Sequence, residues 1–390
     1  MTTDSNYSRL DQVLSISAKR FQKSPWMDSY INGPAVFGVY SGRFYTLSME
    51  DQDPKDIYWQ LRRNVVVYDV PERPIEISGP DAVEFMQKLF TRDISKLRTG
   101  RATYAIACNH QGGILMDGVL MKPDENSYWY TMADGEFLTW MDAHRHGLEV
   151  TIRDPQCWVI QIQGPNSFEV MSQLLEEPVQ QPFKYFDVRQ CHIAGEPFLI
   201  SRTGWTGELG FELYMQNPDI DAAMIFSRIL KAGEAFNMRC GALDSMGMRR
   251  MEAGIMDNGT DMNALMTPYS AGLGQFVELD NKEFIGREAL ATADQSNTFF
   301  GVTADPSTPV NRYNAYLDNT EVGRLTSASY SPCLDRFIGY LKFHQPGFKE
   351  NMAVTLRGKD GKDYSGQVVE LPFYDKEKKI PRGLAKDAEQ

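Results

Sequence analysis

A strand, turn and helix pattern that occurs twice places the strongest constraint on the fold of this chain. PIEISGPDAVEFMQKLF (residues 74–90) and VIQIQGPNSFEVMSQLL (159–175) each run from a β-branched segment through Gly-Pro and Asp or Asn into an amphipathic period. β-Branched residues favour strands, and this turn chemistry is typical of a helix start. Two such units about eighty residues apart indicate an internal duplication, because a solenoid would need several closely spaced repeats.

The remaining segments predict further strands and helices. Residues 64–70 are a β-branched run, and residues 104–133 are typical of an antiparallel meander with a Gly-Gly turn. Residues 221–236 and 245–255 have a helical period, and short strands follow from about residue 284 onward. We therefore expect an α+β fold with a smaller β domain toward the C-terminus.

Charge and cysteine usage exclude several classes of protein. The 390 residues carry 40 Lys and Arg against 52 Asp and Glu, a net charge of -12, which disfavours nucleic acid and anionic membranes as partners. Five scattered cysteines with no Cys-x-x-Cys spacing predict neither a disulfide framework nor a metal site. No leader-like or membrane-spanning apolar run occurs, so we expect a cytoplasmic protein.

The segment SRTGWTGELGFELYM (201–215) carries the first candidate site. Its glycines lead into a strand rather than a helix, which argues against a nucleotide phosphate site. Alternation along GFELYM places Glu212 on the face opposite Phe211 and Leu213, while Glu208 lies in the turn and is expected in solvent. Either Glu212 is on an edge strand in water, or it pairs with two N–H groups of a heteroaromatic ring beside Trp205.

Several motifs, in order, resemble the aminomethyltransferase (glycine cleavage T-protein) family over roughly residues 60–375. SRTGWTGELGFELYM is similar to the family's Ser-Arg-Thr-Gly-Tyr-Thr-Gly-Glu-Asp-Gly-Phe-Glu signature, and TSASYSPCLDRFIGYLKF resembles its closing C-terminal motif. ALDSMGMRRMEAGIMDNGTDMNALMTPYSAGLGQFVELDNKEFIGREAL is similar to its later landmarks. RPIEISGPD and TRDISKLRTGR are closer to the branch that includes dimethylsulfoniopropionate demethylase.

The resemblance implies a three-lobed fold around a central cavity that binds tetrahydrofolate. It places two intertwined α+β lobes in residues 1–290, the C-terminal β domain in 291–375 and a tail in 376–390. Glu212 matches the carboxylate that holds the pterin, and Trp205 stands where the family usually has Tyr. We expect further cofactor contacts from Met132 and Arg249, and Tyr104 to shape the reacting part of the cavity with Trp205 and Met116.

Two departures from the family pattern bear on the reaction. In GGILMDG, Met116 occupies the position of the family's first Asp, and only Asp117, expected on the opposite face, remains. The change argues against aminomethyl transfer and favours transfer of a plain methyl group, which depends on positioning. Leu243 replaces an Arg, a loss for which Arg249 or Arg250 is a candidate replacement.

The donor side is less well defined by the sequence. Trp26, Tyr30 and Tyr40 are candidate substrate-binding residues, because aromatic rings suit either a methylated cation or a methoxyaromatic donor. The leading hypothesis is a tetrahydrofolate-dependent demethylase of a small methylated substrate. The alternatives are an aminomethyltransferase and a non-catalytic folate-binding protein, and the sequence assigns no oligomeric state.

Overall fold

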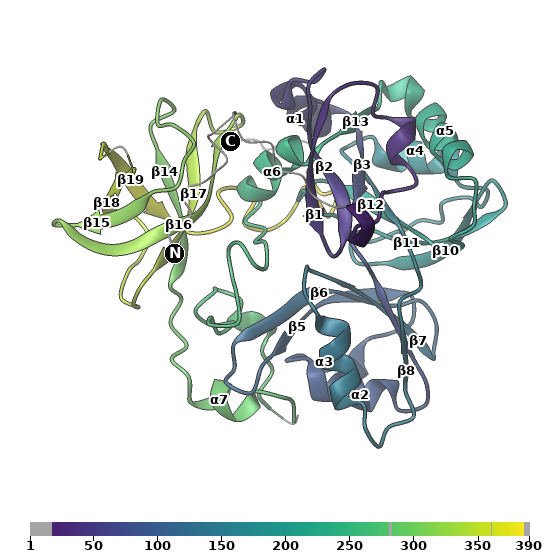
Figure 1. Ribbon diagram of the computed structural model, residues 1–390, viewed down its shortest axis with the longest axis horizontal. Coiled ribbons are helices and arrows are strands. Elements are labelled where there is room, and N and C mark those ends of the chain that lie inside the picture. Colours follow the sequence, from purple (N-terminus) through teal and green to yellow (C-terminus); the bar gives the residue numbers. More distant parts are fainter. Residues whose placement is uncertain (1–17, 281–282, 360, 386–390) are drawn as a thin grey trace.

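The computed structural model describes residues 18–280, 283–359 and 361–385, which form two lobes and a barrel (Figure 1). The predicted mixture of helices and sheets is confirmed. Within the described residues no helix has the length and apolar composition needed to cross a membrane.

The first lobe is built on a five-stranded sheet with the order β5-β6-β7-β4-β8. Its strands are β4 (Ile75–Ser78), β5 (Arg101–Cys108), β6 (Ile114–Lys122), β7 (Ser127–Met132) and β8 (Thr151–Arg153). Antiparallel pairs join β5 to β6 and β6 to β7, as the meander predicted. Helices α2 (Ala82–Leu89) and α3 (Phe137–His144) lie beside this sheet in Figure 1.

The second lobe has a six-stranded sheet with the order β10-β11-β12-β9-β3-β13. Its strands are β3 (Val66–Val70), β9 (Val159–Gln163), β10 (Val188–Ile193), β11 (Glu196–Ser201), β12 (Gly210–Met215) and β13 (Arg239–Gly241). Its helices are α1 (Pro54–Arg63), α4 (Ser167–Leu174), α5 (Ala222–Gly233) and α6 (Leu243–Glu252). A separate hairpin of β1 (Ala35–Tyr40) and β2 (Arg43–Met49) packs against α6 and β3.

The C-terminal β domain is a closed barrel with the strand order β14-β17-β16-β15-β18-β19. Its strands are β14 (Phe299–Ala304), β15 (Asn314–Leu317), β16 (Thr320–Ser331), β17 (Arg336–Phe343), β18 (Ala353–Arg357) and β19 (Asp363–Val369), and α7 (Arg287–Thr292) precedes them. The barrel lies within the predicted range 291–375. Helix α6 contacts α1 on one side and β16 and β17 of the barrel on the other (Figure 1).

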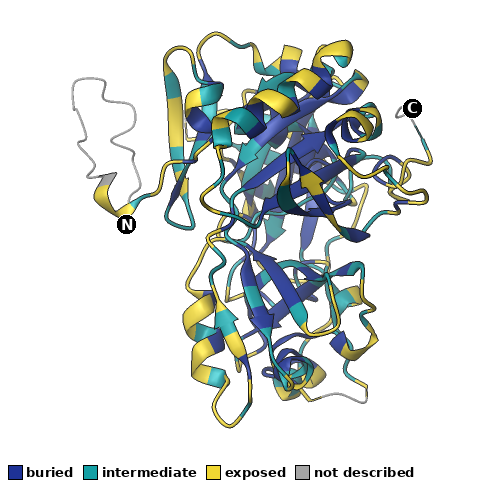
Figure 2. Cartoon of the chain, turned by 90° about the vertical axis from the view of Figure 1, so that its right-hand side faces the viewer, coloured by how far each residue is buried: buried dark blue, intermediate teal, exposed yellow. Residues whose placement is uncertain are grey.

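The duplicated sequence unit forms the same local structure in both lobes. Gly79 and Gly164, which directly follow β4 and β9, have φ angles of 124° and 126°. A Cβ at either residue would lie 2.4 Å from a main-chain oxygen, so only glycine fits this turn. In Figure 2 the strands of both sheets are largely buried, while the helices expose one side. The two units therefore supply equivalent sheet and helix layers to the two lobes.

Candidate functional site

Glu212 lies in the interior of the second lobe, on a strand paired on both sides. Strand β12 pairs with β11 and β9, and only 5% of Glu212 is exposed. The alternative of an edge strand with Glu212 in water is therefore wrong. Alternation is as predicted, since Phe211 and Leu213 pack in the hydrophobic core on the other face.

The Glu212 carboxylate is held by neutral donors. Gln161 Nε2 donates to Oε1 at 2.9 Å, and the Tyr214 and Ser201 hydroxyls donate to Oε2 at 3.1 and 3.4 Å. The Thr203 hydroxyl also donates to Oε2. Burial raises the pKa of Glu212, and these hydrogen bonds oppose the rise. Because Oε1 accepts one hydrogen bond from the described residues, it has a lone pair left for an N–H group of a bound ring, so this residue fits a pterin.

Trp205 is tied to Glu212 through one amide side chain. The Trp205 main-chain N–H donates to Gln161 Oε1 at 3.3 Å, while the other end of the same amide binds Glu212. The indole ring is partly exposed and lies 4.9 Å from the guanidinium carbon of Arg250. Arg250 in turn forms an ion pair with Asp261 at 2.8 Å, which fixes it against the ring.

The first lobe contributes a second carboxylate, the half-buried Asp117 on β6. Its Oδ2 accepts a hydrogen bond from the Tyr104 hydroxyl at 2.7 Å, and its Oδ1 accepts one from Asn258 Nδ2 at 3.0 Å. Burial raises the pKa of Asp117 to about 6, although both hydrogen bonds favour the charged form. The predicted role of Tyr104 thus coincides with a contact to an ionisable group that titrates near neutral pH.

The two predicted methionines lie elsewhere. Met116 is 2% exposed and Met132 is 6% exposed, and both pack in the apolar core of the first lobe with residues such as Phe85 and Phe137. The expectation that Met116 shapes a cavity is therefore wrong, and Met132, expected at the cofactor, likewise lies in the core. Alternation on β6 sends Met116 into the core, so Asp117 is the residue that faces Tyr104.

Arg249 belongs to an interior ion-pair network instead of an open surface. Its Nε donates to Glu208 Oε1 at 2.6 Å, and its Nη1 lies 3.8 Å from Glu252. Glu208 also pairs with Arg62 at 3.2 Å and is 5% exposed. The expectation of a solvated Glu208 is wrong, and the guanidinium of Arg249 is occupied by two carboxylates. Tyr374 lies over Arg249 at 5.0 Å and completes this network.

The three residues predicted to bind the methyl donor separate into two groups. Trp26 is fully buried beside Phe226, and Tyr30 donates to Asp69 Oδ2 at 3.1 Å, so both belong to the core of the second lobe. Tyr40, at the end of β1, is the candidate that lies near Asp117. Of the three donor-side predictions, the structure brings only Tyr40 toward the Asp117 cluster.

Two nearby residues were missed by sequence reasoning. Asn258 anchors Asp117, and Glu72 lies within electrostatic range of Glu212 and Tyr40. The sequence did mark Glu72, as a carboxylate between Pro71 and Pro74 directly after the β-branched run 64–70. No local pattern marked Asn258, because its contact with Asp117 spans 141 residues.

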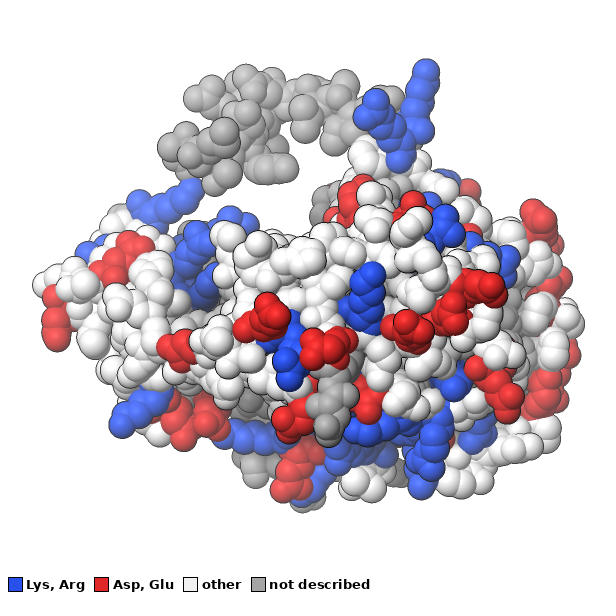
Figure 3. Space-filling model, turned by 90° about the horizontal axis from the view of Figure 1, so that it is seen from below, with Lys and Arg blue, Asp and Glu red and all other residues white. Residues whose placement is uncertain are grey.

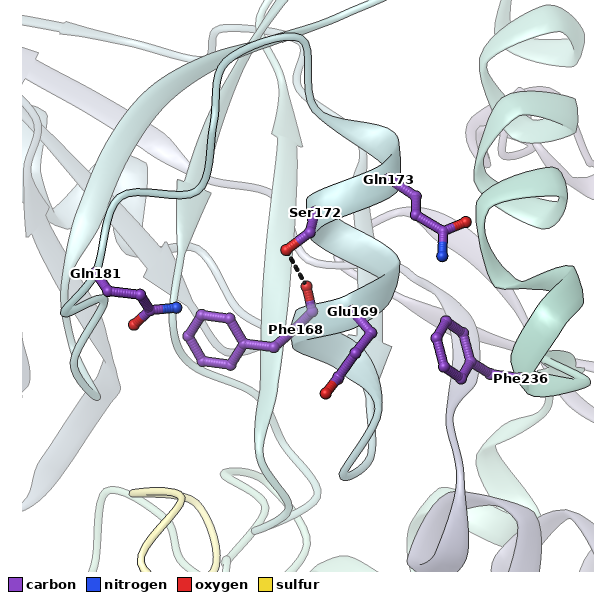
Figure 4. A pocket seen from close by; sticks show the side chains of 6 residues that line it. All are labelled: Phe168, Glu169, Ser172, Gln173, Gln181 and Phe236. Carbon is purple, nitrogen blue, oxygen red and sulfur yellow. Dashed lines mark hydrogen bonds between the residues drawn. The ribbon is translucent and has the colours of Figure 1, made fainter.

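Two surface pockets lie away from these residues. Figure 4 shows one of about 460 Å³, lined by Phe168, Glu169, Ser172 and Gln173 of α4 together with Gln181 and Phe236. The other, of about 510 Å³, is lined by residues of α2, by residues 283–288 and by His110. Neither includes Glu212, Trp205 or Asp117, so the central folate cavity stays a prediction. On the face in Figure 3, acidic and basic side chains are interspersed.

Comparison with known proteins identifies relatives along the whole fold. The model of the GCVT N-terminal domain matches residues 35–281, and that of the glycine cleavage T-protein C-terminal barrel domain matches residues 298–375. An aminomethyltransferase of Lysinibacillus sphaericus is 30% identical over 372 residues, which cover 92% of this chain and 99% of that protein. These matches extend over both lobes and the barrel.

Two relatives from Ruegeria pomeroyi are named for other substrates. A dimethylsulfoniopropionate demethylase is 29% identical over 280 residues, covering 70% of this chain and 76% of that protein. A trimethylamine-oxide aldolase is 28% identical over 384 residues, covering 93% of this chain but 48% of that protein. Among solved structures, the glycine cleavage system aminomethyltransferase T from Bartonella henselae has a TM-score of 0.80 at 21% identity, covering 91% of this chain and 98% of that one. That likeness supports the fold.

Proposed function

Because the chain belongs to the aminomethyltransferase (glycine cleavage T-protein) family of tetrahydrofolate-dependent one-carbon transferases, we propose that it demethylates a small donor. The methyl donor is a sulfonium such as dimethylsulfoniopropionate, a betaine or a methoxyaromatic compound. N5 of tetrahydrofolate would take the methyl carbon as its bond to sulfur, nitrogen or oxygen breaks, and the donor would leave as a thioether, a tertiary amine or a phenolate. Bound tetrahydrofolate supplies the nucleophile. In this proposal Glu212 anchors the pterin, Trp205 forms an apolar wall, and Asp117 accepts the proton released on transfer. We keep a cytoplasmic location as a further prediction.

The observation that carries the proposal is the position of Asp117, which is held by two neutral donors. Tyr104 and Asn258 each donate to one carboxylate oxygen, at 2.7 and 3.0 Å, and each oxygen keeps a lone pair. In the proposal, one of these lone pairs accepts the proton that N5 loses as it is methylated. A methyl group on sulfur, quaternary nitrogen or ether oxygen carries no N–H group, so the donor itself needs no carboxylate partner.

Two relatives support a methylated donor. One is named for demethylation of dimethylsulfoniopropionate and the other for trimethylamine oxide, and both compounds carry methyl groups on a positively charged atom. A raised pKa of about 6 for Asp117 suits a group that takes up and releases a proton near neutral pH.

Aminomethyl transfer is the second candidate function. It is favoured by the orientation of Asp117, which faces Tyr104 although Met116 occupies the preceding position. Several relatives are also named aminomethyltransferases.

Product analysis distinguishes the candidates. The protein is incubated with tetrahydrofolate and, separately, sulfonium, betaine and methoxyaromatic donors or an aminomethylated lipoyl carrier, and the folate product is identified by mass. Methyltetrahydrofolate from a small donor supports demethylation. Methylenetetrahydrofolate from the carrier supports the second candidate, and measurable folate binding without either product supports a binding protein.

A further inference from the structure

Gln161 lies in the interior of the second lobe, directly opposite Glu212. The two residues are partners in the antiparallel pair of β9 and β12, and Gln161 is fully buried. Both ends of its amide are used. Nε2 donates to Glu212 Oε1 at 2.9 Å, and Oε1 of the amide accepts the main-chain N–H of Trp205 at 3.3 Å. One side chain therefore ties the carboxylate on β12 to the glycine turn that precedes this strand.

The two oxygens of Glu212 have different kinds of partners. Within the described residues, Oε2 accepts hydrogen bonds from hydroxyl groups, those of Ser201, Thr203 and Tyr214. A hydroxyl can donate to a charged oxygen or accept from a protonated one. Oε1 faces an amide end that can only donate, because the main-chain N–H of Trp205 holds the other end. A proton taken up by Glu212 is therefore favoured on Oε2, and Oε1 stays an acceptor.

The next glutamine on the same face of β9 has a different role. Gln163 is also fully buried, and its Nε2 donates to the main-chain carbonyls of Thr203 and Phe211 at 3.1 and 3.2 Å. These contacts hold the main chain of the glycine turn. Of the two glutamines, Gln161 is the one that contacts the carboxylate.

We propose that Gln161 is a positioning residue for the cofactor, which keeps Oε1 of Glu212 unprotonated as the acceptor for an N–H group of the pterin. It acts through Glu212 and through the main chain of Trp205. The inference rests on the proposed function, because it takes Glu212 as the residue that holds the pterin.

The ionisable groups around Glu212 allow a pH profile to be interpreted. Tyr214 on the same strand and Tyr185 before β10 each have a pKa raised mainly by burial, so both stay neutral up to about pH 9. Glu72 interacts electrostatically with Glu212, and burial raises its pKa to about 8. Because Glu72 is present in every variant, each effect is measured as a difference from the unchanged protein at the same pH.

Gln161→Met removes the donor to Oε1, so that at low pH the proton of Glu212 can occupy the oxygen that faces the ligand. We expect tetrahydrofolate to bind about tenfold more weakly at about pH 6, and the loss to shrink toward about pH 9 as Glu212 ionises. Equilibrium fluorescence titration at each pH measures the affinity. In a Glu212→Gln background, which has no carboxyl to titrate at this position, the same substitution should show no such pH dependence.

Gln161→Glu keeps the shape of the side chain and an acceptor for Trp205 but removes the obligatory donor. The two facing carboxyl groups then share one proton or repel each other. We expect binding at least about tenfold weaker than in the unchanged protein, and at about pH 9 weaker than in Gln161→Met. A role in packing alone would make Gln161→Glu the milder change. Gln190→Glu, at an exposed residue of β10 in the same sheet, is the control and should leave folate affinity unchanged.

The outcomes separate this inference from the proposed function. The melting temperature reports whether each variant folds. Unchanged affinity in Gln161→Glu, an equal loss at every pH in Gln161→Met, or a pH-dependent loss that persists in the Glu212→Gln background would overturn the inference. If Glu212→Gln alone binds folate as tightly as the unchanged protein, the pterin assignment in the proposed function is wrong as well. The expected pH dependence without methyltetrahydrofolate from any donor would overturn only the proposed demethylation.

Discussion

Two groups of buried and half-buried carboxylates in this protein are stabilised in opposite ways. In the interior network, Glu208 and Glu252 lie against arginines and are compensated by opposite charge. At the candidate site, Glu212 and Asp117 receive hydrogen bonds from neutral amides and hydroxyls. Charge pairing fixes structure, whereas neutral donors hold a carboxylate in place and leave its charge available to a ligand.

The largest expected effect tests the structural half of this contrast. Arg249→Met leaves Glu252 without its arginine and weakens the hold on Glu208, so we expect a loss of about 3–5 kcal/mol in the free energy of unfolding. Chemical denaturation measures it. Arg63→Met, on the exposed side of α1, is the control and should cost little. If Arg249→Met lost little free energy of unfolding but bound folate poorly, the result would support the expectation that Arg249 contacts the cofactor.

Asp117→Asn tests the functional half of the contrast, that a carboxylate held by neutral donors takes part in the reaction. The substitution keeps the shape but removes the proton acceptor, so we expect kcat to fall about 10²- to 10³-fold. Stopped assays of methyltetrahydrofolate formation measure the rate, and the melting temperature reports the fold. Unchanged kcat in a folded Asp117→Asn protein would contradict the proposed role.

Glu212→Gln should act on affinity. A hydrogen bond to a charged group contributes about 1.5–3 kcal/mol, so we expect tetrahydrofolate to bind about 10- to 100-fold more weakly. Equilibrium fluorescence titration is the measurement, with Glu169→Gln on the exposed side of α4 as the matched control. If both variants bind folate equally well, Glu212 does not hold the pterin.

The smallest effect concerns pH and stability. The pKa values of Asp117 and Glu72 are raised to about 6 and about 8, so the folded protein binds protons at these groups that the unfolded chain has released. Their contribution to stability is complete below about pH 4 and is lost as the pH rises through 6 and 8. We expect Glu72→Gln to flatten the fall between about pH 5 and 8 by about 1 kcal/mol per pH unit, measured by denaturation across that range. A slope equal to that of the unchanged protein would contradict the assigned pKa of Glu72.

Sequence reasoning succeeded where the information is local. The repeated unit fixes β4, α2, β9 and α4, and alternation assigns Phe211 to the core and Glu212 to the other face. Alternation also separates Met116 from Asp117, but a strand pattern does not say which face meets the core. The helices packed on the first lobe's sheet decide that, and they bury Met116.

Errors occurred where a partner is remote. Glu208 was expected in solvent because it follows a glycine turn, yet its partners Arg62 and Arg249 come from α1 and α6. Trp26 and Tyr30 have the residue types of a cation cage but fill the core near α5. Such contacts depend on tertiary packing that a single sequence does not reveal.

Glu252 joins the second lobe to the barrel. Its carboxylate, on α6, accepts hydrogen bonds from Tyr58 of the second lobe, from Ser331 of the barrel at 2.5 Å and from Tyr374 beyond the last strand at 2.6 Å. If the chain ended before the barrel, Glu252 would lose the Ser331 and Tyr374 donors. Its buried carboxylate would then lack hydrogen-bond partners that it has in the whole protein. The barrel is therefore an integral part of the lobes and not an exchangeable module.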